Sequence, residues 1–276
     1  MHSRRYSPLM KSLSSLHATL REFGLSTLRW FAGWWRIVVL GSELFVMLIS
    51  ASSYRGASRA NLIRHIYLAA APSLMWFTLL TATLSLVLIR IVVVTAQSYG
   101  LTQYALEMVV RVLVLELIPL TAALFVAVRY SIPRGSELYK LRTRGGFDRL
   151  RQQGLDPIVC ELLPSVVAGV FAVLTLAAVS CVISLVLAYF TIYGFTTWAF
   201  TGYSRIVGQI FSPAVTLIFA LKTMFFSLAV SLIPAGISLQ DLPSSLSRAS
   251  VELQGLIRMF AVLLLVELLS LVGNYY

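Results

Sequence analysis

The sequence predicts an all-α protein that crosses a membrane with five helices. Hydrophobic residues make up 58% of the 276 residues and charged residues only 12%, whereas a soluble domain carries about 25% charged residues. So little polar surface could not cover a globule in water, and the composition therefore fits a lipid environment. Five apolar stretches each reach the roughly 20 residues that a membrane span requires.

Residues 1–56 form a basic first region, in which we expect an in-plane amphipathic helix. The apolar stretch 30–50 contains three tryptophans, and arginines flank it on both sides. A span here would place one basic cluster outside, which the positive-inside rule disfavours. A helix lying in the membrane interface fits better, and a span stays the alternative. This region lacks the apolar core and cleavage site of a signal peptide.

Residues 57–276 form the second region, which holds the five spans. Their expected ranges are about 68–96, 105–130, 162–189, 213–233 and 253–272. Pro213 occupies a suitable first position of the fourth helix. Pro234 is expected just beyond the end of that helix, because proline interrupts the hydrogen bonding of a helix interior.

The charges of the loops predict the orientation in the inner (plasma) membrane. The net charge is +11, and six lysines and arginines lie in the segment 131–161, which we therefore place in the cytoplasm. The loop 97–104 has no charge, and the loop 190–212 has only Arg205 among aromatic residues. Both should face outward, so that the N-terminus is cytoplasmic and the C-terminus outside. We find no nucleic-acid-binding motif and expect no nucleic-acid partner.

Two ionisable residues, Glu116 and Lys222, lie near the middle of predicted spans. A charge at that depth costs roughly 2.5–3.5 kcal/mol, so it should face a partner or a wet cavity. Two interpretations stay open: a buried ion pair that fixes helix packing, and a polar wall of a substrate cavity. Arg90, Arg111 and Arg258 lie nearer helix ends, where they should reach toward lipid headgroups.

The cytoplasmic segment 131–161 should contain a short helix from Phe147 to Gln153. Gly154 ends it, and Asp156 before Pro157 signals the next helix. We expect this element to dock a cytoplasmic partner, and an ordinary solvated loop is the alternative. The residues that would couple to that partner are Phe147, Leu150, Gly154, Asp156 and Pro157.

No catalytic or metal-binding pattern is visible in the sequence. Because there is no G-x-x-x-x-G-K-[ST] loop, ATP should be bound by a separate subunit, and this chain should need no cofactor or metal. Cys160 and Cys181 are too far apart along the chain to pair with each other. The protein should therefore not be an enzyme; an intramembrane enzyme acting on lipids is an alternative without a supporting residue set.

Four stretches between residues 57 and 274 resemble, in order, segments of the MlaE/YrbE permease family, the membrane subunits of ABC transporters that work with MCE-domain proteins. They are "SRANLIRHIYLAAAPSLMWFTLL", "LELIPLTAALFVAVR", "GLDPIVCELLPSVVAGVF" and "LKTMFFSLAVSLI" with the later "LSRAS" and "VGN". The second is similar to the family's R-E-L-G-P segment, and the third to its G-x-D-P stretch.

The resemblance implies a permease subunit of a phospholipid transporter. It implies a dimer with phospholipid in a cavity at the dimer interface, a cytoplasmic ABC ATPase docked between spans two and three, and a periplasmic MCE-domain protein. Glu116 takes the place of the family's glutamate in R-E-L-G-P. Lys222 and Arg248 take the places of its fourth-span lysine and of the arginine in S-R-A, positions that line or support the lipid cavity. Asp156 and Pro157 take the D-P pair.

Some positions depart from the family pattern. They are Leu115 and Ile118 beside that glutamate, Ser165 in the P-R pair, and Gly145-Gly146 at the start of the coupling helix. The acid of the last span is shifted to Glu267, about one turn beyond its expected place at Leu264. These changes leave open a second function, a non-transporting structural or degenerate subunit that anchors an MCE-type assembly.

Overall fold

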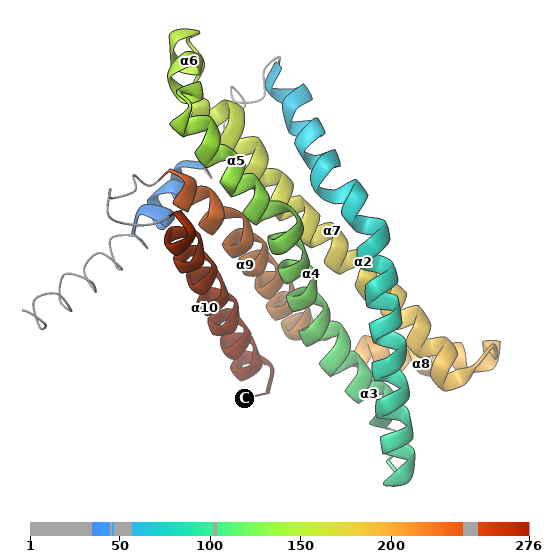
Figure 1. Cartoon of the computed structure of the whole chain (residues 1–276). Helices are drawn as coiled ribbons and strands as arrows, with labels where there is room; N and C mark the ends of the chain where they lie inside the picture. Colours follow the sequence, from blue (N-terminus) through green and yellow to red (C-terminus); the bar gives the residue numbers. More distant parts are fainter. Residues whose placement is uncertain (1–34, 45, 47–56, 102–103, 240–247, 276) are drawn as a thin grey trace, which may run out of the picture. The chain divides into compact units, whose positions relative to one another are not determined.

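The computed structural model describes residues 35–44, 46, 57–101, 104–239 and 248–275, in which every regular element is a helix (Figure 1). Five helical stretches in these residues are long and apolar enough to cross a membrane, which confirms the predicted fold class and number of spans. They are Leu62–Ser98, Ala105–Thr143, Ile158–Tyr193, Pro213–Ser238 and Leu253–Asn274. Each extends beyond the range expected from hydropathy.

The helices differ in length and in hydrogen-bond pattern. The α-helices are α2 (Ala57–Ser98), α3 (Ala105–Val109), α4 (Ile118–Val126), α5 (Ile132–Thr143), α6 (Gly146–Gln152), α7 (Leu163–Tyr193), α8 (Phe200–Ile210), α9 (Pro213–Ser238) and α10 (Arg248–Tyr275). Three π-helical segments continue them: η3 (Val110–Leu117), η4 (Ala127–Ser131) and η5 (Ile158–Leu162). The second span is therefore one continuous helical rod from α3 to α5.

The helix α7 is central to the packing. α2 packs along α7, α9 packs against both α7 and α10, and α4 contacts α7 and α9 (Figure 1). A Cβ atom placed on Gly169 of α7 would lie 2.5 Å from Oγ of Ser231 on α9. Ser85 of α2 and Ser184 of α7 share a buried 2.7 Å hydrogen bond. Close approach at small residues and hydroxyl contacts between helices are how helices associate in lipid.

Large apolar side chains on the outer helices point away from the bundle. Met75 and Trp76 on α2, and Leu268 and Leu269 on α10, are exposed. An apolar surface of this kind would be unusual on a soluble monomer. Lipid tails are the solvent that suits it.

The end of α9 differs from the prediction. We expected the helix to stop before Pro234, but it continues to Ser238. Transmembrane helices tolerate an internal proline when neighbours satisfy the freed backbone groups. Here α5 packs so closely that a Cβ on Gly135 would lie 3.0 Å from the Pro234 carbonyl oxygen. Arg142 of α5 also donates a hydrogen bond to the Leu239 carbonyl, so α5 supports the turns beyond the proline.

The connection between α7 and α9 is rich in aromatic residues. The Tyr203 hydroxyl on α8 donates to the Leu185 carbonyl at 2.9 Å, and its ring packs edge-on against Tyr189. Burial raises the pKa of Tyr203 to about 12. Phe195 and Trp198 project almost fully exposed, as aromatic residues do at a membrane interface.

The chain divides into two compact units, Met1–Val46 and Met47–Tyr276. In the first unit, residues 35–44 and 46 are helical, and the rest of the stretch 30–50 lies outside the described residues. The in-plane placement of this stretch stays a prediction. So does the division of the chain into regions 1–56 and 57–276.

Candidate functional site

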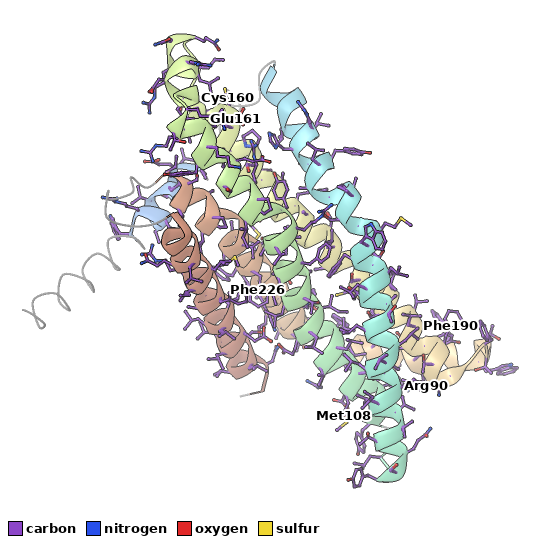
Figure 2. The ribbon with its side chains drawn as sticks, in the orientation of Figure 1. Arg90, Met108, Cys160, Glu161, Phe190 and Phe226 are labelled. Atoms are coloured by element: carbon purple, nitrogen blue, oxygen red, sulfur yellow. The ribbon has the colours of Figure 1, made fainter. Side chains whose placement is uncertain are left out.

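Lys222 on α9 is the least exposed charged residue in the part of the chain that the structure describes, at 2%. It lies about 13 Å along the helix from Pro213, far from either end of the span. Its Nζ atom is 5.8 Å from the centre of the Phe226 ring, within the range of a cation–π contact. Phe226 is fully buried, and Figure 2 labels it over the middle of the bundle.

The π-helical segment η3 carries the first partner of this lysine. Lys222 Nζ donates to Oε2 of Glu116 and lies 3.4 Å from the Leu115 carbonyl oxygen, a second acceptor. The residues from Leu113 to Glu116 are all buried. π-helical segments often occur at functional sites, because the extra residue per turn changes which side chains face a neighbour.

α10 supplies two further polar side chains. Glu267 Oε2 lies 2.9 Å from Lys222 Nζ, an ion-pair distance, although without the alignment of a hydrogen bond. Asn274 Nδ2 donates to Glu116 Oε1 at 3.3 Å. Lys222, Glu116, Glu267 and Asn274 form what we call the Lys222 cluster. Its acid at position 267, one turn away from the place that the family pattern indicated, still contacts the lysine.

The Lys222 cluster holds one cation against two carboxylates. The side chain of Lys222 is 1% exposed, that of Glu116 11% and that of Glu267 16%. Desolvation offsets much of the attraction in a buried pair, but removal of one partner leaves an uncompensated charge and costs about 3–5 kcal/mol. Of the two interpretations of Glu116 and Lys222, a buried ion pair and a polar cavity wall, the geometry contains the ion pair.

A second group of charges lies near the end of the bundle that carries α6. Arg134 of α5 donates to Glu161 at 2.6 Å and to Glu137 at 3.0 Å. Its Nε atom donates to Ser165 Oγ at 3.3 Å, and its Nη2 atom lies 3.4 Å from Nε2 of His65 on α2. These five residues form the Arg134 cluster; Figure 2 shows Glu161 at this end, close to Cys160.

Sequence reasoning assigned Arg134 only to a basic loop. The sequence signal for a larger role was Ser165, which stands where the family pattern has an arginine. In the structure, the guanidinium of Arg134 lies beside Ser165 and contacts residues of α2, α5 and the start of the third span.

The short helix predicted in the segment 131–161 is present as α6 (Gly146–Gln152), within a residue of its expected bounds. Gly145 precedes it with φ 71° and Gly154 follows it with φ 75°, a conformation that glycine adopts without a Cβ clash. Asp156 Oδ1 accepts a hydrogen bond from the Ile158 amide at 2.9 Å. Phe147 and Pro157 are buried and Leu150 is half-buried, while Asp148, Arg149 and Arg151 face outward.

Arg90 and Arg111 form no hydrogen bond or ion pair with the residues of either cluster. Arg248 begins α10, and its side chain lies outside the described part of the structure. Arg90 is exposed on α2, toward the end of the bundle opposite Glu161 (Figure 2). Arg111 pairs with Glu107 at 2.9 Å. Neither Cys160 nor Cys181 is in a disulfide, and the described residues contain no group of side chains that could hold a metal ion.

Comparison with known proteins adds one finding to this geometry. The model of the family described as Permease MlaE matches residues 62–272, more than half of the chain. The matched range includes Glu116, Lys222, Glu267 and Arg134, whereas Asn274 lies just beyond it. A comparison with curated proteins finds no match.

Proposed function

Since this chain belongs to the MlaE permease family, we propose that it is the permease subunit of an ABC-type phospholipid transporter in the inner membrane. A separate cytoplasmic ATPase supplies the energy, because the sequence lacks a nucleotide-binding loop. An MCE-domain protein outside and a second permease copy complete the assembly. The membrane-embedded fold and the family support a permease of lipid transport; the finer assignments are our proposal.

The observation that carries this proposal is the Lys222 cluster. Apolar helices associate in lipid through close packing and need no ions for it. Charged groups inside a membrane are costly and mark paths for polar substrates. The side chains of Glu116 and Glu267 keep some exposure at the edge of the cluster. We assign this edge to the headgroup of the transported lipid, with Arg248 as a further supporting residue.

The α5–α6 region is the proposed contact for the ATPase. Phe147 and Pro157 are buried, so in this proposal they hold the shape of the element while its outward residues meet the partner. Leu150, Gly154 and Asp156 complete the turn that leads into the third span. The Arg134 cluster lies between this element and α2, where it would transmit movement into the bundle.

The test is an affinity purification of the tagged full-length chain in mild detergent, from cells that express its natural partners. We expect an ATPase subunit, an MCE-domain protein and phospholipid to co-purify. The purified complex in vesicles should move lipid only with ATP. Glu116→Gln should reduce that rate at least tenfold, whereas Glu107→Gln, nine residues earlier in the same span, should leave it unchanged. A chain that purifies with neither ATPase nor lipid would overturn the proposal.

A structural subunit that anchors an MCE-type assembly is the second candidate. It is favoured by the fact that Lys222 already finds its acceptors within this chain, and by Gly145-Gly146 in place of the usual coupling-helix start. Neutral substitutions of Glu116 and Lys222 that leave transport intact would support this candidate over the first.

A further inference from the structure

Each π-helical segment in the described part of the chain ends two residues before a proline. The pairs are η3 with Pro119, η4 with Pro133 and η5 with Pro164. The residue just before each proline donates its N–H to the carbonyl five residues earlier rather than four. Proline has no N–H, and its ring clashes with the carbonyl four residues before it. The three prolines therefore account for where the helical hydrogen bonding changes.

η3 leaves two backbone carbonyls without their usual donors. Pro119 cannot donate to the Leu115 carbonyl, which an α-helix bonds from four residues later. The Ile118 N–H would bond the Val114 carbonyl in an α-helix, but it donates to Leu113 instead. Val114 and Leu115 are both buried. Because a buried carbonyl without a hydrogen bond is costly, these two need donors from outside their own helix.

Two neighbouring helices supply these donors. Lys222 Nζ on α9 donates to the Leu115 carbonyl oxygen at 3.4 Å. Cys181 Sγ on α7 donates to the Val114 carbonyl oxygen at 3.8 Å, as a weaker donor than the ammonium. Side chains of α7 and α9 thus bond the backbone of the second span at the point where its own hydrogen bonds are interrupted.

We propose that η3 is a hinge of the second span and that Lys222 holds it closed. Prolines and π-helical segments are where helices kink, and here the bonds that would resist bending come from other helices. A bend at η3 takes the Leu115 carbonyl away from Lys222 and moves the adjacent Glu116 with it. Opening of the hinge and separation of the Glu116–Lys222 pair are therefore one event. The hinge goes beyond the proposed function, because a structural subunit would contain it as well.

The experiment measures the bend between two exposed positions on either side of η3, Met108 and Val128. Both carry spin labels in the full-length chain in lipid nanodiscs, and electron paramagnetic resonance gives the distribution of distances between them. The native cysteines are replaced in this background by Cys160→Ser and Cys181→Ser. Serine keeps a hydroxyl donor at position 181, so the hinge retains both of its side-chain contacts.

Lys222→Met should broaden the distance distribution about twofold, because it removes the main donor that closes the hinge. Glu267→Gln is the matched control: it removes an ion-pair partner of Lys222 but leaves the donor to Leu115 in place, so the width should not change. Pro119→Ala supplies the missing N–H to the Leu115 carbonyl. Added to Lys222→Met, it should restore the narrow distribution, which a role of Lys222 through charge alone does not predict.

An unchanged width in Lys222→Met would overturn the proposal. So would equal broadening in Glu267→Gln, or a failure of Pro119→Ala to restore the narrow distribution. If Lys222→Met does not fold, the comparison of Cys181→Ala with Cys181→Ser decides, because it removes the second donor without changing any charge. Cys181→Ala should then give the broader distribution, and equal widths would overturn the hinge.

Discussion

The Arg134 cluster and the Lys222 cluster both place one cation between two carboxylates, but in different surroundings. The acids that pair with Arg134 are 62% and 26% exposed, and those that pair with Lys222 are 11% and 16% exposed. Solvent screens the pair of Arg134 with the mostly exposed Glu137, and a pair of this kind contributes about 0–1 kcal/mol, whereas the pair of Arg134 with Glu161 is only partly exposed. A buried pair is strongly coupled, because each group left alone carries a desolvation penalty. The ion pairs should therefore contribute less to stability in the Arg134 cluster than in the Lys222 cluster.

The type of cation differs as well. Arg134 has a planar guanidinium with five donors, and it contacts residues of three helical segments at once. Lys222 has a compact ammonium, and the acceptors within its reach are Glu116, the Leu115 carbonyl and Glu267. We conclude that Arg134 connects helices near the end of the bundle, whereas Lys222 sets the local charge within it.

Lys222→Met should have the largest effect. It removes the only cation of the Lys222 cluster and leaves Glu116 and Glu267 facing each other in an apolar surrounding, at a cost of about 3–5 kcal/mol. Thermal unfolding in detergent and ATP-driven lipid transport are the measurements. Lys222→Arg keeps the charge and should recover part of the stability. An unchanged unfolding temperature for Lys222→Met would show that the cluster is not coupled as its burial indicates.

Glu116→Gln should cost less, about 1–2 kcal/mol, because the amide oxygen still accepts from Lys222 and the pair with Glu267 remains. The double variant Glu116→Gln with Glu267→Gln leaves Lys222 buried without any carboxylate partner. Its loss of unfolding free energy should exceed the sum of the two single losses, since the three groups share one network. Simple additivity would contradict the description of a single cluster.

Arg134→Lys should destabilise the protein, because one ammonium cannot reproduce the several contacts of the guanidinium. The loss should be only about 1 kcal/mol, because water screens the exposed part of the cluster. The informative measurement is the ratio of lipid moved to ATP hydrolysed, which should fall if the cluster transmits movement from α6. Arg144→Lys, an exposed position before α6, serves as the control. A coupling ratio equal to that of the control would limit Arg134 to a structural role.

Ser184→Ala should have the smallest effect, about 0.6 kcal/mol, the average for a hydrogen bond between transmembrane helices. The variant removes the uncharged contact between α7 and Ser85 of α2 and leaves both ion clusters in place. Chemical denaturation of the wild type and variant measures the difference. A loss as large as that of Lys222→Met would show that packing, rather than charge, dominates the bundle.

Residues of α6 and α9 show how far local sequence signals reach. Gly154 and the Asp156-Pro157 pair predicted the end of α6 and the start of the next helix, because these residues act through their own backbone conformation. Pro234 misled the prediction of the end of α9, because the effect of a proline depends on what packs beside it. Gly135 and Arg142 of α5, almost a hundred residues earlier, supply that support.

The sequence by itself determined the all-helical class, the five spans and the presence of Glu116 and Lys222 at membrane depth. Hydropathy and charge are properties of a single helix, so the sequence of that helix is enough to predict them. Only the tertiary structure decided that Glu267 and Asn274 join this pair, and that Arg134 takes the place facing Ser165. Those contacts depend on the rotation and register of separate helices, which long-range packing and the π-helical turn of η3 set together.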